Sequence, residues 1–247
     1  MERNITSEAI VLKSRRWGEL HRRITLLSPS LGLFDATVYG GQKGKLAGLI
    51  EPFIVGNYYI YHNPSKKEYS IKDVQLIETL EEIKKDLKHL YIANAMAELT
   101  LKVHGGDFKE LYNLLKLHLG MLKEFEYRKV FIQYVWRLIK VMGLESDLLC
   151  CPLCGKNYQE EEIVAYNEKM HTVCCFDCKD VFADDYGIML PPGSRRYLLF
   201  TENLSVYAAL SVELNERTTE RLFRYMIRSI TSIVGSNIQS LASDIFR

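Results

Sequence analysis

All six cysteines of the chain lie between Cys150 and Cys178, and this clustering constrains the fold more than any other feature of the sequence. Cys151 and Cys154 form one C-x-x-C pair, and Cys175 and Cys178 form a second. Two such pairs, separated by a short segment, have the spacing of a four-thiolate zinc site in which each pair binds the metal through one tight turn. The spacing therefore predicts one zinc ion bound by these four thiolates.

Other interpretations of the cysteines are less favoured. A disulfide framework is typical of small secreted proteins, whereas this sequence shows no signal peptide. A redox dithiol uses one C-x-x-C beside a βαβ unit, not two pairs that flank a polar hairpin. Cys150, Cys174 and His171 lie close to the pairs in sequence and stay open as substitute ligands.

The predicted zinc is structural. A catalytic zinc keeps one coordination position open, whereas four thiolates fill every position. The nucleotide-deaminase signature, H-x-E followed by P-C-x-x-C, is absent, because no histidine is followed two residues later by glutamate. Pro152 also follows Cys151 instead of preceding it.

Length and composition leave room for one large domain or two to three small ones in 247 residues. Because the net charge is only +1, the whole molecule is not a polybasic nucleic-acid binder. The charge is nevertheless uneven, since residues 1–50 contain eight Lys/Arg and four Asp/Glu. No apolar run approaches the ~18 residues that span a membrane. We therefore expect a cytoplasmic protein.

Residues 5–77 have the alternation and the turn residues of short β-strands. The five candidate strands are Ala9–Lys13, Ile24–Leu27, Leu33–Tyr39, Phe53–Tyr61 and Tyr69–Ile77. An arginine-rich connection joins the first two of them. Five short strands suit a small barrel, and the OB-fold is the commonest of these that binds polymers. The sequence predicts an N-terminal OB-fold β-barrel that binds nucleic acid.

Apolar residues at helical spacing predict an α-helical bundle in the remainder. Stripes run through Ile83–Ala97, Phe108–Leu122 and Phe131–Met142, with Thr79 as a cap before the first and Gly143 after the last. Further helices are expected near 196–212, over Leu222–Ile233 before Gly235, and briefly through Leu241 and Ile245. The predicted fold class is α+β, with a zinc module inserted between helices. The predicted domains are 1–78 (OB-fold), 79–145 (first helical part), 146–190 (zinc insertion) and 191–247 (second helical part).

The strongest candidate for a nucleic-acid interface is a group of cations near the start of the chain: Arg15, Arg16, Arg22, Arg23, Lys43 and Lys45. On an OB-fold, cations meet phosphates while aromatic faces, such as those of Trp17 or Tyr39, stack on bases. The alternative is that these charged side chains are merely solvated.

No catalytic constellation emerges from the sequence. The segment GGQKGKL suggests a Walker A motif, but that motif needs glycine where Tyr39 stands and Ser/Thr where Leu46 stands. No nucleophile–base pair or carboxylate dyad is evident either, so we expect a protein that is not an enzyme.

The ordered motifs resemble the RecO family of DNA repair and recombination mediator proteins. The N-terminal run is similar to the opening of that family: EAIVLKSRRWGELHRRITLLSPSLGLFDATVYGG. Pro52 is similar to the proline that opens the fourth strand in that family. The segment CPLCGK, followed by a second C-x-x-C pair, is similar to the zinc knuckles of many members. Ile238–Leu241, followed by Ile245 and Phe246, is similar to its closing L-K-S motif. The family loop usually reads G-A-R-K, so Gln42 here removes one cation.

The resemblance implies a non-catalytic protein that binds single- and double-stranded DNA and anneals complementary strands. It implies that RecR acts with it to load RecA onto strands coated by single-strand-binding protein, and that the helical region contacts the C-terminal tail of that coating protein. A nucleoid-associated location in the cytoplasm follows. Two alternatives stay open: a non-catalytic interaction scaffold and a zinc-ribbon DNA-binding regulator.

Overall fold

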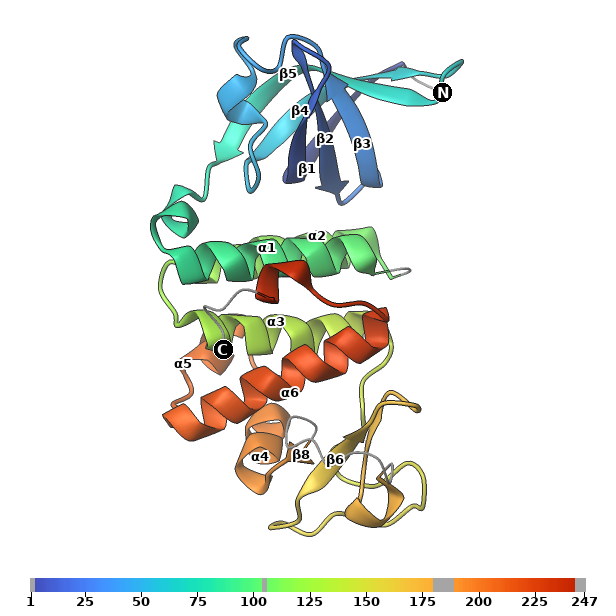
Figure 1. The fold of residues 1–247 in the computed structure, drawn as a ribbon, viewed down its shortest axis with the longest axis vertical. Coiled ribbons are helices and arrows are strands. Elements are labelled where there is room, and N and C mark those ends of the chain that lie inside the picture. Colours follow the sequence, from blue (N-terminus) through green and yellow to red (C-terminus); the bar gives the residue numbers. More distant parts are fainter. Residues whose placement is uncertain (1–2, 104–105, 180–188, 243–247) are drawn as a thin grey trace. The chain divides into compact units, whose positions relative to one another are not determined.

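The computed structural model describes residues 3–103, 106–179 and 189–242 (Figure 1). The chain divides into two compact units. The first comprises residues 1–86 and 106–120, and the second comprises residues 87–105 and 121–247. The order of barrel, helices, cysteine module and helices confirms the predicted fold class.

Five strands close into the barrel of the first unit: β1 (Asn4–Trp17), β2 (His21–Ser28), β3 (Gly32–Val38), β4 (Val55–Asn63) and β5 (Glu68–Glu78). Their order is β1-β2-β3-β5-β4, and only the short β3–β5 pairing is parallel among these strands. The predicted alternation on β3 is confirmed, because Phe34, Ala36 and Val38 are buried in the barrel core.

The arginine-rich segment is not a loop, contrary to the prediction. β1 and β2 continue as a two-stranded ribbon to a turn at residues 18–20, and this ribbon pairs Arg15 with Arg23 and Arg16 with Arg22. The apolar alternation used for the prediction ends where the ribbon leaves the barrel core, although the backbone pairing goes on. Its register is irregular between Val11 and Lys13, where Leu12 has no partner and forms a β-bulge.

Helix α2 (Phe108–Met121) packs on the barrel. Tyr112 and Lys116 both donate to Oε1 of Glu8 on β1, at 2.5 and 2.7 Å. These two hydrogen bonds hold the pKa of Glu8 below its usual value. The ring of Phe108 lies where a Cβ on Gly32 would stand, only 2.7 Å away, and Gly32 has a φ of +69°. A side chain at position 32 would therefore displace α2 or strain the turn.

The second unit, which we call the helical unit, contains α1 (Leu87–Lys102), α3 (Tyr127–Val141), α4 (Pro192–Thr201), α5 (Val206–Ser211) and α6 (Glu216–Val234). Gly143 and Gly235 end α3 and α6 with φ of +69° and +65°, as predicted. Within the described parts of the chain, no helix is long and apolar enough to cross a membrane.

Three predicted helix boundaries were wrong. A 3₁₀ turn at Glu81–Lys85 precedes α1, and Thr79 caps no helix there. The single helix expected near 196–212 is two helices, because Ser205 starts α5 afresh by accepting a hydrogen bond from the Ala208 N–H. The last helix is a 3₁₀ turn at Gln239–Leu241, and Ile245 lies outside the described residues.

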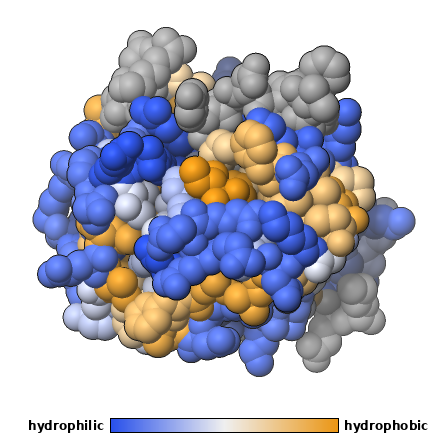
Figure 2. Space-filling model, turned by 90° about the horizontal axis from the view of Figure 1, so that it is seen from below, coloured by the Kyte–Doolittle hydropathy of each residue, from blue (hydrophilic) through white to orange (hydrophobic). Residues whose placement is uncertain are grey.

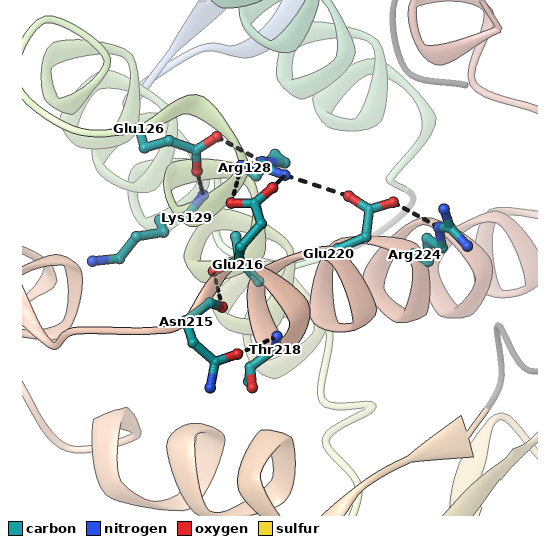
Figure 3. A network of polar contacts seen from close by, with 9 residues as sticks. Glu126, Arg128, Lys129, Asn215, Glu216, Thr218, Glu220 and Arg224 are labelled. Carbon is teal, nitrogen blue, oxygen red and sulfur yellow. Dashed lines mark hydrogen bonds and ion pairs between the residues drawn. The ribbon is translucent and has the colours of Figure 1, made fainter.

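Arg128 joins the N-terminal ends of α3 and α6 (Figure 3). Its guanidinium donates to both carboxylate oxygens of Glu216, at 2.6 and 3.0 Å, and to Glu126 at 2.7 Å. Glu126 caps α3 at the Lys129 N–H. A bidentate, half-enclosed pair of this kind fixes the approach of two helices better than an exposed ion pair does.

Between α3 and α4, the chain forms a small sheet of β6 (Val164–Asn167), β7 (Thr172–Cys174) and β8 (Met189–Leu190), in the order β7-β6-β8. The cysteines lie around this sheet. We call residues 150–179 the cysteine module.

Candidate metal centre and nucleic-acid interface

The Sγ atoms of Cys151, Cys154, Cys175 and Cys178 all lie within 4.8 Å of one another. The Sγ atoms of Cys154 and Cys175 are 3.7 Å apart. A tetrahedron with zinc–sulfur distances of about 2.3 Å has sulfur–sulfur edges of about 3.8 Å, so the four thiols fit such an ion. The structure thus brings together the four cysteines that the spacing selected, and this group could bind a metal ion.

The two cysteine pairs reach this geometry through different turns. In the first, Gly155 has a φ of +75° and donates to the Cys151 carbonyl at 2.8 Å. In the second, Phe176–Cys178 forms a 3₁₀ turn, and Lys179 has an ordinary φ of −64°. The second turn therefore needs no glycine at position 179.

The thiols have unequal proton affinities. Burial opposes ionisation of Cys151, but hydrogen bonds from the backbone N–H groups of Cys175, Cys154 and Leu153 outweigh it and lower its pKa to about 6. Hydrogen bonds with Cys175 and Cys154 raise the pKa of Cys178. Four thiolates this close repel one another, so a divalent cation is the natural counter-charge.

The three candidates for substitute ligands lie outside this group. Cys150 donates to the Asp147 carboxylate at 3.0 Å, and Cys174 is buried, which raises its pKa to about 11. His171 lies in the turn between β6 and β7, where its Nδ1 is 3.2 Å from the Ser232 hydroxyl of α6.

The cysteine module is fastened to the helices at two places. Arg228 of α6 forms an ion pair with Glu168, and Ser232 donates to the Glu168 carbonyl at 3.4 Å. Arg195 of α4 is almost fully buried and donates to the carbonyls of Gln159 and Glu160. The module is thus part of the helical unit, not a flexible appendage.

Figure 2 shows the surface on the side of α4 and the cysteine module, where apolar groups alternate with polar ones. A pocket of about 220 Å³ opens in the helical unit, lined by Trp136, Leu148, Leu149, Leu199, Ser146 and three carboxylates, those of Glu145, Asp147 and Glu202. Its acidic rim favours a cationic ligand over an acidic one.

On the exterior of the barrel, Trp17 lies against two arginines of the ribbon. The guanidinium carbons of Arg15 and Arg23 are 5.8 and 5.5 Å from its ring centroid, within the range of cation–π contacts. Trp17 is still 47% exposed. We call Arg15, Trp17 and Arg23 the Trp17 surface. Nearby, the rings of His21 and Tyr39 meet edge to face at 5.1 Å.

The six predicted cations do not form one cluster. Since side chains alternate along a strand, Arg16 and Arg22 point to the face opposite that of Arg15 and Arg23. Three of the six are engaged by carboxylates: Arg22 by Glu51 at 2.6 Å, Arg23 by Asp35 at 3.3 Å and Lys45 by Asp73 at 3.2 Å. Within the described chain, Arg15, Arg16 and Lys43 have no carboxylate partner.

Gln42 has a role that the sequence did not suggest. Its amide donates to the carbonyls of Gly18 and His21 at 3.0 and 3.2 Å, which fastens the loop after β3 to the turn between β1 and β2. This position therefore supports the ribbon instead of supplying a cation.

A second aromatic and basic surface was missed. Tyr59 and Tyr61 lie on the outward face of β4, and the Lys72 ammonium is 5.1 Å from the Tyr61 ring centroid. We call Tyr59, Tyr61 and Lys72 the Tyr59 surface. The alternation of Tyr58 and Ile60 with Tyr59 and Tyr61 could have revealed it, because the first pair is buried.

Comparison with known proteins identifies the family. Residues 1–80 match the model described as Recombination protein O N terminal, and residues 84–242 match that described as Recombination protein O C terminal. Proteins named DNA repair protein RecO are similar along most of their length. That of Thermoanaerobacter sp. (strain X514) is 31% identical over 184 residues, 72% of each chain. That of Bacillus pumilus (strain SAFR-032) is 25% identical over 225 residues, 88% of this chain and 84% of the relative. The chain therefore belongs to the RecO family of DNA repair proteins.

Proposed function

We propose that this protein is a recombination mediator that binds DNA through its barrel and anneals complementary strands. The observation that carries the proposal is the Trp17 surface, where an exposed indole lies between cations on the outside of a five-stranded barrel. Aromatic rings that stack on bases, beside cations that contact phosphates, are the common means of holding a single strand without reading its sequence. Double-stranded DNA is a second ligand for the same cations.

The DNA-binding residues in this proposal are Arg15, Arg16, Arg22, Arg23, Lys43 and Lys45. Arg15 carries most weight, since it combines a free charge with the Trp17 contact. Arg22, Arg23 and Lys45 contribute less, because each already has a carboxylate partner. A phosphate must displace that partner before it gains the full charge interaction.

The protein works without catalysis in this proposal. Duplex formation is downhill once two strands meet, so the protein needs only to offset phosphate repulsion and raise the local strand concentration. One structural zinc, held by Cys151, Cys154, Cys175 and Cys178, would supply a rigid cross-link within the helical unit.

The partners proposed here follow from family membership. RecR would act with this protein to load RecA onto strands coated by single-strand-binding protein, within the nucleoid. Binding of the C-terminal tail of the coating protein would hold the barrel near the coated DNA strand.

The test is annealing of complementary oligonucleotides, bare and coated, without ATP and across a salt series. We expect acceleration over spontaneous annealing and an affinity that falls with salt, by a slope of about −0.7 per phosphate contact on single strands. Strict dependence on ATP would contradict the proposal. Absence of DNA binding would favour an interaction scaffold, and preference for one sequence would favour a regulator.

A further inference from the structure

We propose that the Tyr59 surface is a second site for single-stranded nucleic acid, which lets one barrel hold two strands at once. The inference rests on the proposed function, because it assigns a second strand to a protein whose first strand lies on the Trp17 surface.

The geometry of the Tyr59 surface resembles that of the Trp17 surface. Tyr59 is 43% exposed, and it alternates with the buried Tyr58 and Ile60, so its ring stands on the outside of the barrel. The register between β4 and β5 pairs Tyr59 with Asp73 and Ile60 with Ile71, which leaves Lys72 as an extra residue in a bulge. The bulge brings its ammonium over the Tyr61 ring, at 5.1 Å. A base has an exposed aromatic face to stack on, and a phosphate has a cation beside it.

Charge complementarity favours a nucleic acid as the occupant. The exposed Arg3, Lys66 and Lys67 lie at the same end of the β4–β5 hairpin, since the Arg3 carbonyl accepts from the His62 N–H at 2.8 Å, next to Tyr61. Of the two nearby carboxylates, Asp73 is already paired with Lys45, and Glu68 is exposed at the turn. The cations outnumber the acids, and the tyrosine rings are separated by the two-residue repeat of the strand.

The two surfaces lie toward opposite ends of β1. Tyr59 pairs with Thr6 near its start, and Arg15 lies near its end. The intervening strand corresponds to at most about 30 Å at 3.3 Å per residue. Both surfaces face outward from one barrel and have no residue in common, so strands bound to them are held close together. Holding two strands in this way raises their effective concentration for pairing.

The experiment uses the full chain and two non-complementary thymidine oligonucleotides, one with a donor fluorophore and one with an acceptor. Sedimentation first establishes the concentration at which the protein is monomeric. We expect energy transfer between the two strands on wild-type monomers. The double variant Tyr59→Ala/Tyr61→Ala and the single variant Lys72→Gln should weaken capture of the second strand about tenfold. Affinity for one strand alone should change by less than about twofold, because the Trp17 surface is distant.

Two further variants keep the test decisive. Tyr59→Phe/Tyr61→Phe retains the rings and should capture the second strand as wild type does. The matched control is Lys88→Gln, since Lys88 also lies over a tyrosine, Tyr127, but in the helical unit. It should leave both measurements unchanged.

The outcomes separate the two proposals. Unchanged capture of the second strand by both the alanine and the glutamine variants would overturn this inference while leaving DNA binding intact. The inference would also be overturned if these variants lost binding of a protein partner but kept capture of the second strand. Failure of the wild-type protein to bind any single strand would overturn the proposed function and this inference together.

Discussion

The metal centre and the Trp17 surface were predicted from similar evidence, namely a few chemically suitable residues close together in sequence, yet they differ in how they are built. The four thiols converge within 4.8 Å, whereas the six cations divide between two faces of a ribbon and a loop. Each pair of thiols is positioned by one turn, so its geometry depends on the residues within that turn. The cations are positioned by strand alternation and by carboxylates far away in sequence. Short-range spacing therefore predicts which side chains converge when one turn positions them, and does so poorly when strand register positions them.

The largest effect is expected from removing one of the four clustered thiols. Cys154→Ser or Cys178→Ser should lose zinc and unfold the cysteine module, because the apparent binding energy of a structural zinc is about 10–16 kcal/mol. Metal content, measured under reducing conditions, and amide hydrogen exchange across residues 150–179 are the readouts.

The control for this prediction is Cys150→Ser, which lies outside the thiol group and should keep its zinc. Absence of zinc from the wild-type protein, or full retention in both ligand variants, would contradict the assignment.

The next effect tests the difference between free and neutralised cations. Replacing Arg15 by glutamine together with Trp17→Ala should weaken single-strand affinity about tenfold and flatten the salt slope, because a stacking face and a phosphate contact are both removed. Fluorescence anisotropy across a salt series measures both quantities.

Arg22→Gln is the matched comparison on the same ribbon. Arg22 is already paired with Glu51 at 2.6 Å, so its loss should change affinity by less than about twofold. If Arg22→Gln weakened single-strand affinity as much as the Arg15/Trp17 double variant, then neither the strand face nor the carboxylate pairing would determine which cations contact DNA.

A smaller effect concerns the attachment of the cysteine module. Arg228→Gln removes the ion pair with Glu168, which is partly exposed and stabilises by less than about 1 kcal/mol. We expect faster amide exchange in the turn between β6 and β7, with zinc retained. Arg224→Gln, which pairs within α6, should leave that turn unchanged. Loss of zinc from the Arg228 variant would mean that the module depends on its attachment to form the site.

The smallest effect is a dependence on pH. Lys116 and Tyr112 lower the pKa of Glu8, so the stability contributed by this cluster is present above the unfolded pKa, near 4.3, and is lost as pH falls through the lower folded value. Glu8→Gln should reduce the loss of stability below about pH 4, as measured by urea unfolding of the full chain. If Glu8→Gln left the loss of stability below about pH 4 unchanged, this role for Glu8 would be contradicted.

Most of the fold could be predicted because burial imposes regular patterns. The alternation of Phe34, Ala36 and Val38 and the end of α6 at Gly235 were both visible in sequence. The ribbon was not, because its outer residues contact solvent and leave no apolar pattern. The break before α5 was also hidden, since Ser205 acts as a cap only once the chain has turned.

The candidate sites divide in the same way. The four thiols that converge could be selected from spacing alone. The pairing of Arg22 with Glu51, and of Lys45 with Asp73, depends on the closed barrel, which brings together residues that are 28 or 29 positions apart. The Tyr59 surface was missed because Lys72 reaches Tyr61 only through a bulge, which no periodicity predicts.

The bulge at Leu12 decides which residues of the ribbon face outward. Before it, Ala9 and Val11 point into the barrel core, whereas after it Lys13, Arg15 and Trp17 point away from the core. Because Leu12 is the extra residue, deleting it would restore simple alternation and leave Lys13, Arg15 and Trp17 on the outer face. Deleting a residue beyond the bulge would instead exchange the two faces of everything that follows in β1. In evolutionary terms, a single-codon deletion at the bulge would therefore be better tolerated than one farther along the ribbon, which would move the residues after it to the opposite face.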